Sequence, residues 1–142
     1  MTLNELYLYA EQNGIETFDW NIRGSKGLAL KMGYYYIALN RKLIESESDE
    51  RIVLAHELGH CMTDQLHYIE DIKNPLYKQN IQKAERRAKN FSYQLIAPVS
   101  QIIAAAKFSD DEREIAELLD VDLNTLKGAV QYYKRKKRKG LM

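Results

Sequence analysis

The chain has 142 residues, of which 45% are hydrophobic and 29% are charged, a size and balance typical of one globular domain and not of a disordered segment. The net charge is +1, but Lys134–Lys139 contribute six positive charges, so the remaining residues are net acidic and a protein that is basic over its whole surface is excluded. The single cysteine, Cys61, excludes an internal disulfide and a cysteine-built zinc finger. Because neither a signal-like N-terminal segment nor an apolar run of roughly 20 residues is present, we expect a cytoplasmic protein.

The N-terminal part predicts one helix followed by a small sheet. Residues 2–13 form the helix, because apolar side chains recur three and four positions apart and Gly14 ends the pattern. These apolar side chains belong to Leu3, Leu6, Tyr7 and Ala10. Strand-like runs follow at residues 15–22, 28–32 and 34–39. With a turn at Gly33, they predict an antiparallel sheet of about three strands.

Two longer helices are predicted in the centre of the chain. Ser46 or Ser48, in an acidic loop, can cap a helix that runs from about residue 49 to residue 64. A second and longer helix covers about 76–97, and Pro98 stops it. The residues that carry chemistry lie on these two helices.

The last third of the chain predicts a helix-turn-helix-like unit after a short helix over residues 100–107. Ser109–Glu112 is a capping-box pattern that opens the next helix, in which Leu118 and three other apolar residues are expected to face inward. Asp122 then caps a final helix. The order of one helix, a small sheet and then mostly helices predicts an α+β domain in which the sheet packs on a helical core.

The strongest chemical signal is an H-E-x-x-H motif that begins at His56 and ends at His60. The spacing of four puts both histidines on one face of a helix, one turn apart, so that they can bind one metal ion. Glu57 lies about a third of a turn round, beside the metal, where it can deprotonate a water molecule. The alternative is an amphipathic helix that happens to carry two histidines. The apolar run Ile52–Ala55 argues against it, because unsatisfied imidazoles are costly in a core helix.

Two histidines do not complete a catalytic zinc site, which has three protein ligands and an open position. Glu85 lies between Ala84 and Ala88 in the inward stripe of the long helix, and a carboxylate that faces a core needs a partner or a metal. Glu85 is therefore the preferred third ligand, unless it lies at the edge of the stripe and reaches solvent. His67, near the end of the motif helix, is the alternative ligand. A His₂Glu set suits zinc, and manganese or iron can also bind such donors.

A site of this kind predicts peptide hydrolysis. Zinc would polarise the peptide carbonyl, while Glu57 takes a proton from water and passes it to the leaving amine. The developing oxyanion needs a further donor, for which Tyr68, Tyr77 and His67 are candidates among which the sequence does not choose.

Two segments resemble the motifs of the ImmA/IrrE family of zinc metallopeptidases. Residues 54–60 read LAHELGH, which resembles the core motif of that family. Residues 85–91 read ERRAKNF and residues 95–98 read LIAP, similar to the family's second motif, E-x-x-A-N-x-F followed by L-L-x-P. Lys89 stands where the family usually has asparagine, and Ser92 where it usually has alanine. The resemblance extends over most of the chain, although these two motifs are its specific part.

The resemblance implies a cytoplasmic zinc endopeptidase in which His56, His60 and Glu85 bind Zn²⁺ and Glu57 is the catalytic base. Members of the family are commonly encoded by phages and mobile elements beside a helix-turn-helix repressor, which they cleave. The expected partner is therefore a protein substrate, and a helix-turn-helix repressor is the expected example.

The whole chain, residues 1–142, is expected to form a single metallopeptidase domain. Residues 1–108 would contain the sheet and the zinc-site core, and residues 109–142 a C-terminal helical unit with a basic tail. This unit also has the spacing of a DNA-reading helix-turn-helix, so the alternative function is a DNA-binding or protein-binding regulator with a non-catalytic zinc site. Residues 110–122 are rich in acids that would face phosphates, so direct nucleic-acid binding is not expected.

Two residues beside the H-E-x-x-H motif carry further predictions. Gly59 is expected to be small because another element approaches the motif helix there, so that Gly59→Leu should weaken zinc binding. Cys61, one position after the second histidine, is expected to point away from the metal and to be dispensable for binding it.

Overall fold

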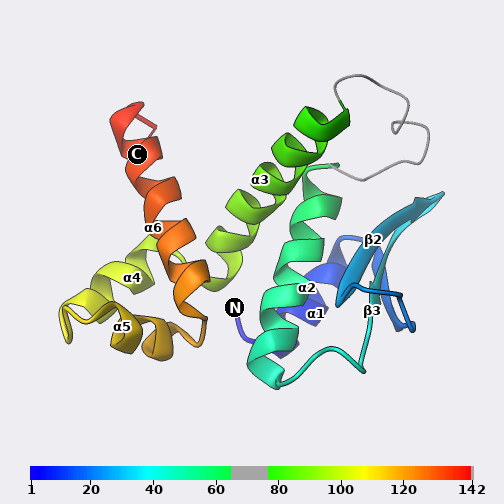
Figure 1. Cartoon of the computed structure of the whole chain (residues 1–142), viewed down its shortest axis with the longest axis horizontal. Helices are drawn as coiled ribbons and strands as arrows, with labels where there is room; N and C mark the ends of the chain where they lie inside the picture. The colour runs from blue at the N-terminus through cyan, green and yellow to red at the C-terminus, as the bar shows by residue number, and fades with distance from the viewer. Residues whose placement is uncertain (65–76, 142) are drawn as a thin grey trace.

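The structure, a computed structural model, describes residues 1–64 and 77–141. This part of the chain contains six helices and a three-stranded sheet, so the predicted α+β class is confirmed (Figure 1). The elements are α1 (Leu3–Gln12), β1 (Ile15–Asp19), β2 (Gly27–Met32), β3 (Tyr34–Leu39), α2 (Glu47–Met62), α3 (Tyr77–Ile96), α4 (Val99–Ala106), α5 (Glu112–Leu119) and α6 (Leu123–Arg138). None of the helices in the described residues is long and apolar enough to span a membrane.

The helices begin at side chains that accept hydrogen bonds from the first-turn amides. Thr2 and Glu5 form a capping box at the start of α1. Ser46 accepts the amide of Asp49, so α2 begins at Glu47, two residues before the predicted start. Asp122 caps α6 as predicted, by accepting the amide of Thr125 at 2.8 Å.

The start of α5 differs from the prediction, because its N-cap is Asp111 and not Ser109. The Asp111 carboxylate accepts the amide of Arg113, while the Ser109 hydroxyl donates to the side chain of Glu114. Leu118 was expected to face inward, yet it is 62% exposed. The buried face is formed by Ile115, Ala116 and Leu119, and because Ala116 and Leu119 lie on the same side of Ile115 around the helix, Leu118 on its other side is turned to solvent.

The sheet is mixed, and the prediction of a fully antiparallel sheet is wrong. β2 and β3 form the expected antiparallel hairpin, with Gly33 in the left-handed region at φ 74° in its turn. The strand order is β1-β3-β2, and β1 pairs with β3 in parallel. Successive strands reverse direction, so the first and third run the same way, and they become neighbours because β2 lies on the far side of β3. β2 is consequently an edge strand.

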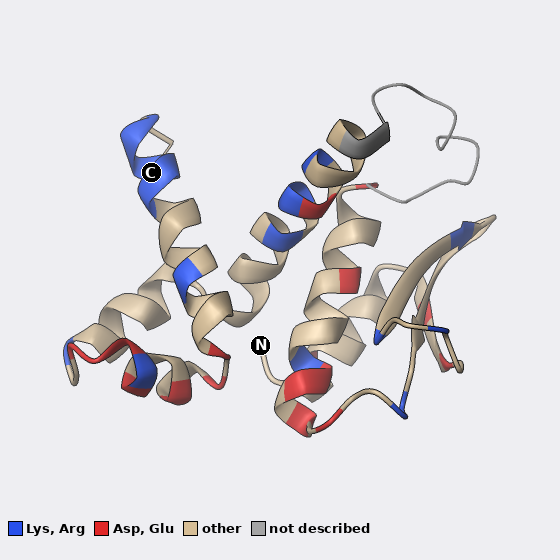
Figure 2. Cartoon of the chain, in the orientation of Figure 1, with Lys and Arg blue, Asp and Glu red and all other residues tan. Residues whose placement is uncertain are grey.

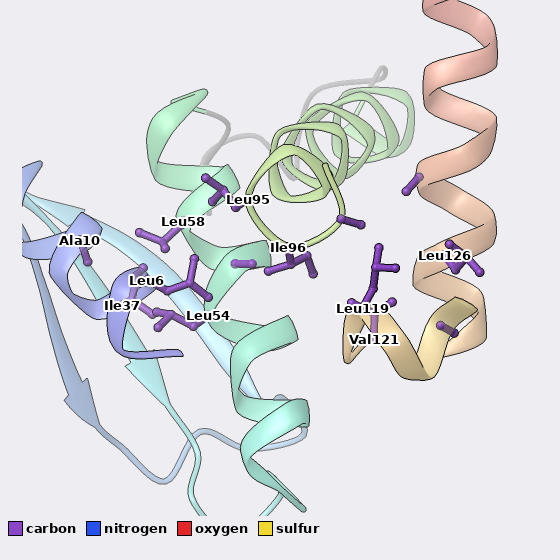
Figure 3. Packing of buried hydrophobic residues seen from close by; sticks show 14 of the residues in the cluster. Leu6, Ala10, Ile37, Leu54, Leu58, Leu95, Ile96, Leu119, Val121 and Leu126 are labelled. Carbon is purple, nitrogen blue, oxygen red and sulfur yellow. The ribbon is translucent and has the colours of Figure 1, made fainter. Parts of the chain in front are cut away.

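Helices α1 and α2 cover one face of the sheet (Figure 1). Inward residues of the strands, such as Ile37, pack against Leu6 of α1 and against Leu54 and Leu58 of α2 (Figure 3). These four side chains are fully buried. This packing fixes the motif helix against the sheet, with β2 running beside it.

The hydrophobic cluster continues from the end of α3 into the C-terminal helices. Leu95 and Ile96 belong to the same cluster as Leu119 of α5 and Leu126 of α6 (Figure 3). The hydroxyl of Tyr133 on α6 donates to the carbonyl of Ala97, just after α3, at 3.0 Å. Helices α4 to α6 are thus anchored to the end of α3 by apolar contacts and by this buried hydrogen bond.

Candidate metal centre

Helix α2 presents the two histidines of the H-E-x-x-H motif one turn apart, as the spacing predicts. The Nε2 atoms of His56 and His60 lie 3.2 Å from each other. His60 is buried, and His56 is half-buried. Both rings therefore direct the same nitrogen to one point beside the helix.

Helix α3 adds the carboxylate of Glu85 at this point. One oxygen of Glu85 lies 2.9 Å from Nε2 of His56, and the other lies 3.0 Å from Nε2 of His60. Glu85 comes from between the buried residues Ala84 and Ala88, where the stripe pattern placed it, and 36% of its side chain is exposed. The predicted third residue is thus brought to the two histidines from a separate helix.

The close crossing of α2 and α3 depends on Gly59. A Cβ atom added to Gly59 would lie 3.0 Å from Cα of Ala88 and would overlap the carbonyl oxygen of that residue. Because such a contact cannot be relieved without moving backbone, a larger residue would push α3 away from α2. The prediction that another element approaches the motif helix at Gly59 is confirmed.

The donor atoms of these three side chains fit a metal ion. In a tetrahedral zinc site with bonds of roughly 2.0–2.1 Å, ligand atoms lie roughly 3.3 Å apart. The three separations among His56, His60 and Glu85 are 2.9, 3.0 and 3.2 Å, so an expansion of a few tenths of an ångström would suffice. Two imidazoles and one carboxylate are also a donor set that zinc accepts.

Glu57 lies in the same group but on the side of the sheet. Ligand atoms of His56, Glu57 and His60 all lie within 4.8 Å of one another, so this trio could also hold a metal ion. Glu57 is buried, and a Cβ added to Gly27 at the start of β2 would lie 3.0 Å from its Cγ. β2 therefore packs directly on the Glu57 side chain.

A cavity of about 280 Å³ opens beside this group. One wall is formed by Ser25 and the first three residues of β2, and the other carries the histidines and both glutamates. The prediction from sequence missed β2 and Gly27 as parts of the site. A glycine at the start of a strand was the available signal, but nothing local shows that this strand lies against the motif helix.

Cys61 does not belong to the group of histidine and glutamate donors. It is buried in the hydrophobic cluster, which agrees with the prediction that it is not turned to the metal. Burial, reinforced by the negative charges of Glu57 and Asp64, raises the pKa of its thiol to about 12. The thiol is thus protonated at neutral pH, a poor state for a metal ligand.

Other candidates lie outside the described residues. His67, the alternative ligand, and Tyr68 fall in residues 65–76, and the side chain of Tyr77 is likewise outside the description. Their predicted roles, as third ligand or as oxyanion donors, stay predictions.

The fold and the site together define an α+β protein with an H-E-x-x-H helix, crossed by a second helix that carries a glutamate. The family model of the IrrE N-terminal-like domain, a peptidase family, matches residues 10–129. The chain belongs to this family, and the predicted resemblance is confirmed. No curated protein and no solved structure matches the chain. The family match extends through α5 and into α6, so these helices are part of the family's domain.

Proposed function

We propose that the protein is a zinc-dependent metalloendopeptidase. In this proposal His56, His60 and Glu85 hold the metal, and Glu57 is the general base. The observation that carries it is the carboxylate of Glu85, whose two oxygens lie 2.9 and 3.0 Å from the Nε2 atoms of the two histidines. Membership in a peptidase family supports the reaction class.

Glu85 is a better third ligand than Glu57 for two reasons. Glu85 comes from another helix and already matches one oxygen to each histidine. Glu57 packs on Gly27 of β2 and lines the cavity, which suits a group that transfers protons near a bound peptide. Burial of Glu57 also keeps bulk water from competing for its carboxylate.

In the proposed mechanism, the metal ligands and Glu57 have separate roles. His56, His60 and Glu85 would hold the zinc ion, which when bound would supply a Lewis acid able to polarise a carbonyl and acidify water. Glu57 takes the proton from the attacking water and delivers it to the amine of the leaving segment. β2 is an edge strand beside the cavity, so an extended peptide can pair with it and present its scissile bond to Glu57.

The proposed substrate is a helix-turn-helix repressor, cleaved in the cytoplasm. This part of the proposal rests on the resemblance to the ImmA/IrrE family. Members of that family are commonly encoded by phages and mobile elements beside such a repressor. The described residues contain the cavity of about 280 Å³ beside the histidines but no feature specific to one repressor.

The second candidate function is a DNA-binding regulator with a non-catalytic metal. The helix pair α5–α6 and the basic end of α6 favour it (Figure 2). However, α5 and its flanks carry a row of acidic residues, which would oppose a phosphate backbone (Figure 2). These acids are Asp110, Asp111, Glu112, Glu114, Glu117, Asp120 and Asp122. The peptidase proposal gives a role to both glutamates beside the histidines, whereas the regulator proposal gives no role to Glu57.

Metal analysis by mass spectrometry tests the proposal. The purified wild type is expected to hold about one zinc ion per chain, and Glu85→Ala to lose it. Arg86→Ala is the matched control, because Arg86 is the exposed neighbour of Glu85 on α3 and should leave the metal in place. Glu57→Gln should also retain the metal, as expected for a base that is not a ligand.

Each contrary result removes a stated part of the proposal. A wild type without metal, even after zinc is supplied, would contradict the enzyme and favour the regulator. Retention of zinc in Glu85→Ala together with its loss in Glu57→Gln would exchange the roles of the two glutamates.

A further inference from the structure

We propose that a second cavity beside the metal centre binds a carboxylate of the substrate through Lys89. This inference rests on the proposed peptidase function and deepens it, because it names a chemical preference near the scissile bond. The cavity measures about 240 Å³ and lies among α2, α3 and the start of α6. Its volume suffices for one medium-sized side chain.

The second cavity adjoins the metal centre through His56. This residue lines both the β2 cavity and the second cavity. The two cavities therefore flank the group of His56, His60 and Glu85. A peptide whose scissile bond lies at this group would run along β2 on one side and place a neighbouring residue in the second cavity on the other.

The lining of the second cavity includes both apolar and polar side chains. Ile52 of α2 and Ile96 of α3 contribute apolar surface, while Tyr93 and Asn124 contribute hydrogen-bonding groups. Tyr93 is held in place by α6, because a Cβ added to Gly128 would overlap its hydroxyl group. The absent side chain at Gly128 thus makes room for the tyrosine that forms this wall.

Lys89 supplies a positive charge to this cavity. It lies four residues after Glu85, one turn along the same face of α3, and it is exposed. In residues 1–64 and 77–141 its ammonium group forms no ion pair. A lysine in such a position can form a charge-assisted hydrogen bond with an incoming carboxylate.

The other charged group at the second cavity is already engaged. The Asp122 carboxylate accepts the amide of Thr125 at 2.8 Å and caps α6, at the positive end of that helix. Its negative charge still acts on Tyr93 in this cavity, where the positive charge of Arg135 opposes it with the larger effect. Lys89 is thus the lining group that an incoming negative charge can pair with, and that charge can belong to an Asp or Glu side chain or to a terminal carboxylate.

A peptide-cleavage profile tests the inference. The full-length, zinc-loaded protein is incubated with a defined peptide library, and the cleaved bonds are identified by mass spectrometry. The wild type is expected to prefer peptides with Asp or Glu within two residues of the cleaved bond. Lys89→Gln should abolish this preference, and Lys89→Glu should replace it with a preference for Lys or Arg. Lys83→Gln, an exposed lysine on the same helix, is the matched control that should retain the wild-type profile.

Two versions of the library distinguish the sources of the carboxylate. With C-terminally amidated peptides, a retained preference assigns the site to an Asp or Glu side chain. A preference seen only with free C-termini assigns it to the terminal carboxylate.

Binding supplies a readout that does not depend on turnover. Peptide affinity is measured by fluorescence anisotropy in the Glu57→Gln background, with peptides that carry Glu or Gln at the preferred position. The Glu peptide is expected to bind at least about tenfold more tightly, as for one charge-assisted hydrogen bond, and Lys89→Gln should remove the difference. Zinc content should not change in Lys89→Gln, which separates substrate binding from support of the metal ligands.

The outcomes separate this inference from the proposed function. A wild type that cleaves peptides without acidic preference, or a Lys89→Glu variant with an unchanged profile, would overturn the role of Lys89 alone. A wild type that binds no zinc and cleaves no peptide would overturn both.

Discussion

Helix α2 carries both a buried arginine, Arg51, and the two histidines of the H-E-x-x-H motif, and the polar atoms of these side chains find their partners in opposite ways. Arg51 donates to main-chain carbonyls: Nε to Met1 at 2.7 Å, and its terminal nitrogens to Ile96 at 3.0 Å and to Asp120 at 2.8 Å. The group of His56, His60 and Glu85 has its contacts among its own side chains and opens to a cavity.

This difference indicates that Arg51 has a structural role, whereas the group of His56, His60 and Glu85 is available to bind a ligand. The carbonyls at the ends of α3 and α5 lack partners within their helices, and a buried guanidinium supplies donors to both ends at once. Burial lowers the pKa of Arg51, but a guanidinium remains charged in proteins and complements the negative ends of the two helices. Arg51 therefore fixes the C-terminal helices against α2, and so the shape of the second cavity, while the histidine group is left for a ligand.

Among substitutions at the proposed catalytic site, Glu57→Gln should have the largest effect on activity. Removal of the general base is expected to lower the rate of substrate cleavage by about 10³-fold, while zinc content and the free energy of unfolding stay near the wild-type values. The rate is measured on a repressor or peptide that the wild type cleaves. Glu47→Gln, at an exposed position of the same helix, is the control and should retain activity. A Glu57→Gln variant with wild-type turnover would show that the base lies elsewhere.

Among substitutions at structural residues, Arg51→Met should have the largest effect on stability. It leaves buried carbonyls of α3 and α5 without donors, so the free energy of unfolding is expected to fall by about 3 kcal/mol. Urea denaturation measures this change, with a chelator present so that metal binding does not contribute. Arg113→Met, on the exposed face of α5, should change stability by less than about 0.5 kcal/mol. Equal effects of the two substitutions would contradict the role given to Arg51.

Gly59→Leu should connect the two sides of the comparison, because the new side chain separates the helix with the histidines from the helix with Glu85. We expect a loss of about 2 kcal/mol in stability and at least tenfold weaker zinc binding. Denaturation and competition with a chelator measure the two effects. Met62→Leu, at a partly exposed position of α2, should change neither. Unchanged zinc affinity in Gly59→Leu would mean that Glu85 is not a ligand.

Cys61→Ser should have the smallest effect. Zinc content is expected to remain at the wild-type level, and stability to fall by about 1 kcal/mol because a hydroxyl replaces a buried thiol. In the wild type, the raised pKa of the thiol predicts slow reaction with a thiol reagent at pH 8 until the protein unfolds. Loss of zinc in Cys61→Ser would make this residue part of the metal site.

The sequence by itself determined the features that depend on neighbouring residues. The cap at Asp122 follows from hydrogen bonds within one helical turn, as does a serine cap for α2, for which the sequence offered Ser46 or Ser48. The pairing of His56 with His60 follows from a spacing of four. Glu85 could also be singled out, because a carboxylate among inward alanines indicates a buried partner.

Only the tertiary structure decided which distant segments meet. β1 lies parallel to β3, and β2 forms one wall of the cavity beside the histidines. This strand order depends on packing against α1 and α2 and not on the strand sequences alone. The roles of Arg51 and Lys89 were likewise invisible, since each depends on residues far along the chain that approach it in space. Local hydrogen bonds and helical periodicity depend on a few consecutive residues, so they can be predicted from the sequence. Cavities and buried donor–acceptor pairs between distant residues form only when the whole core packs.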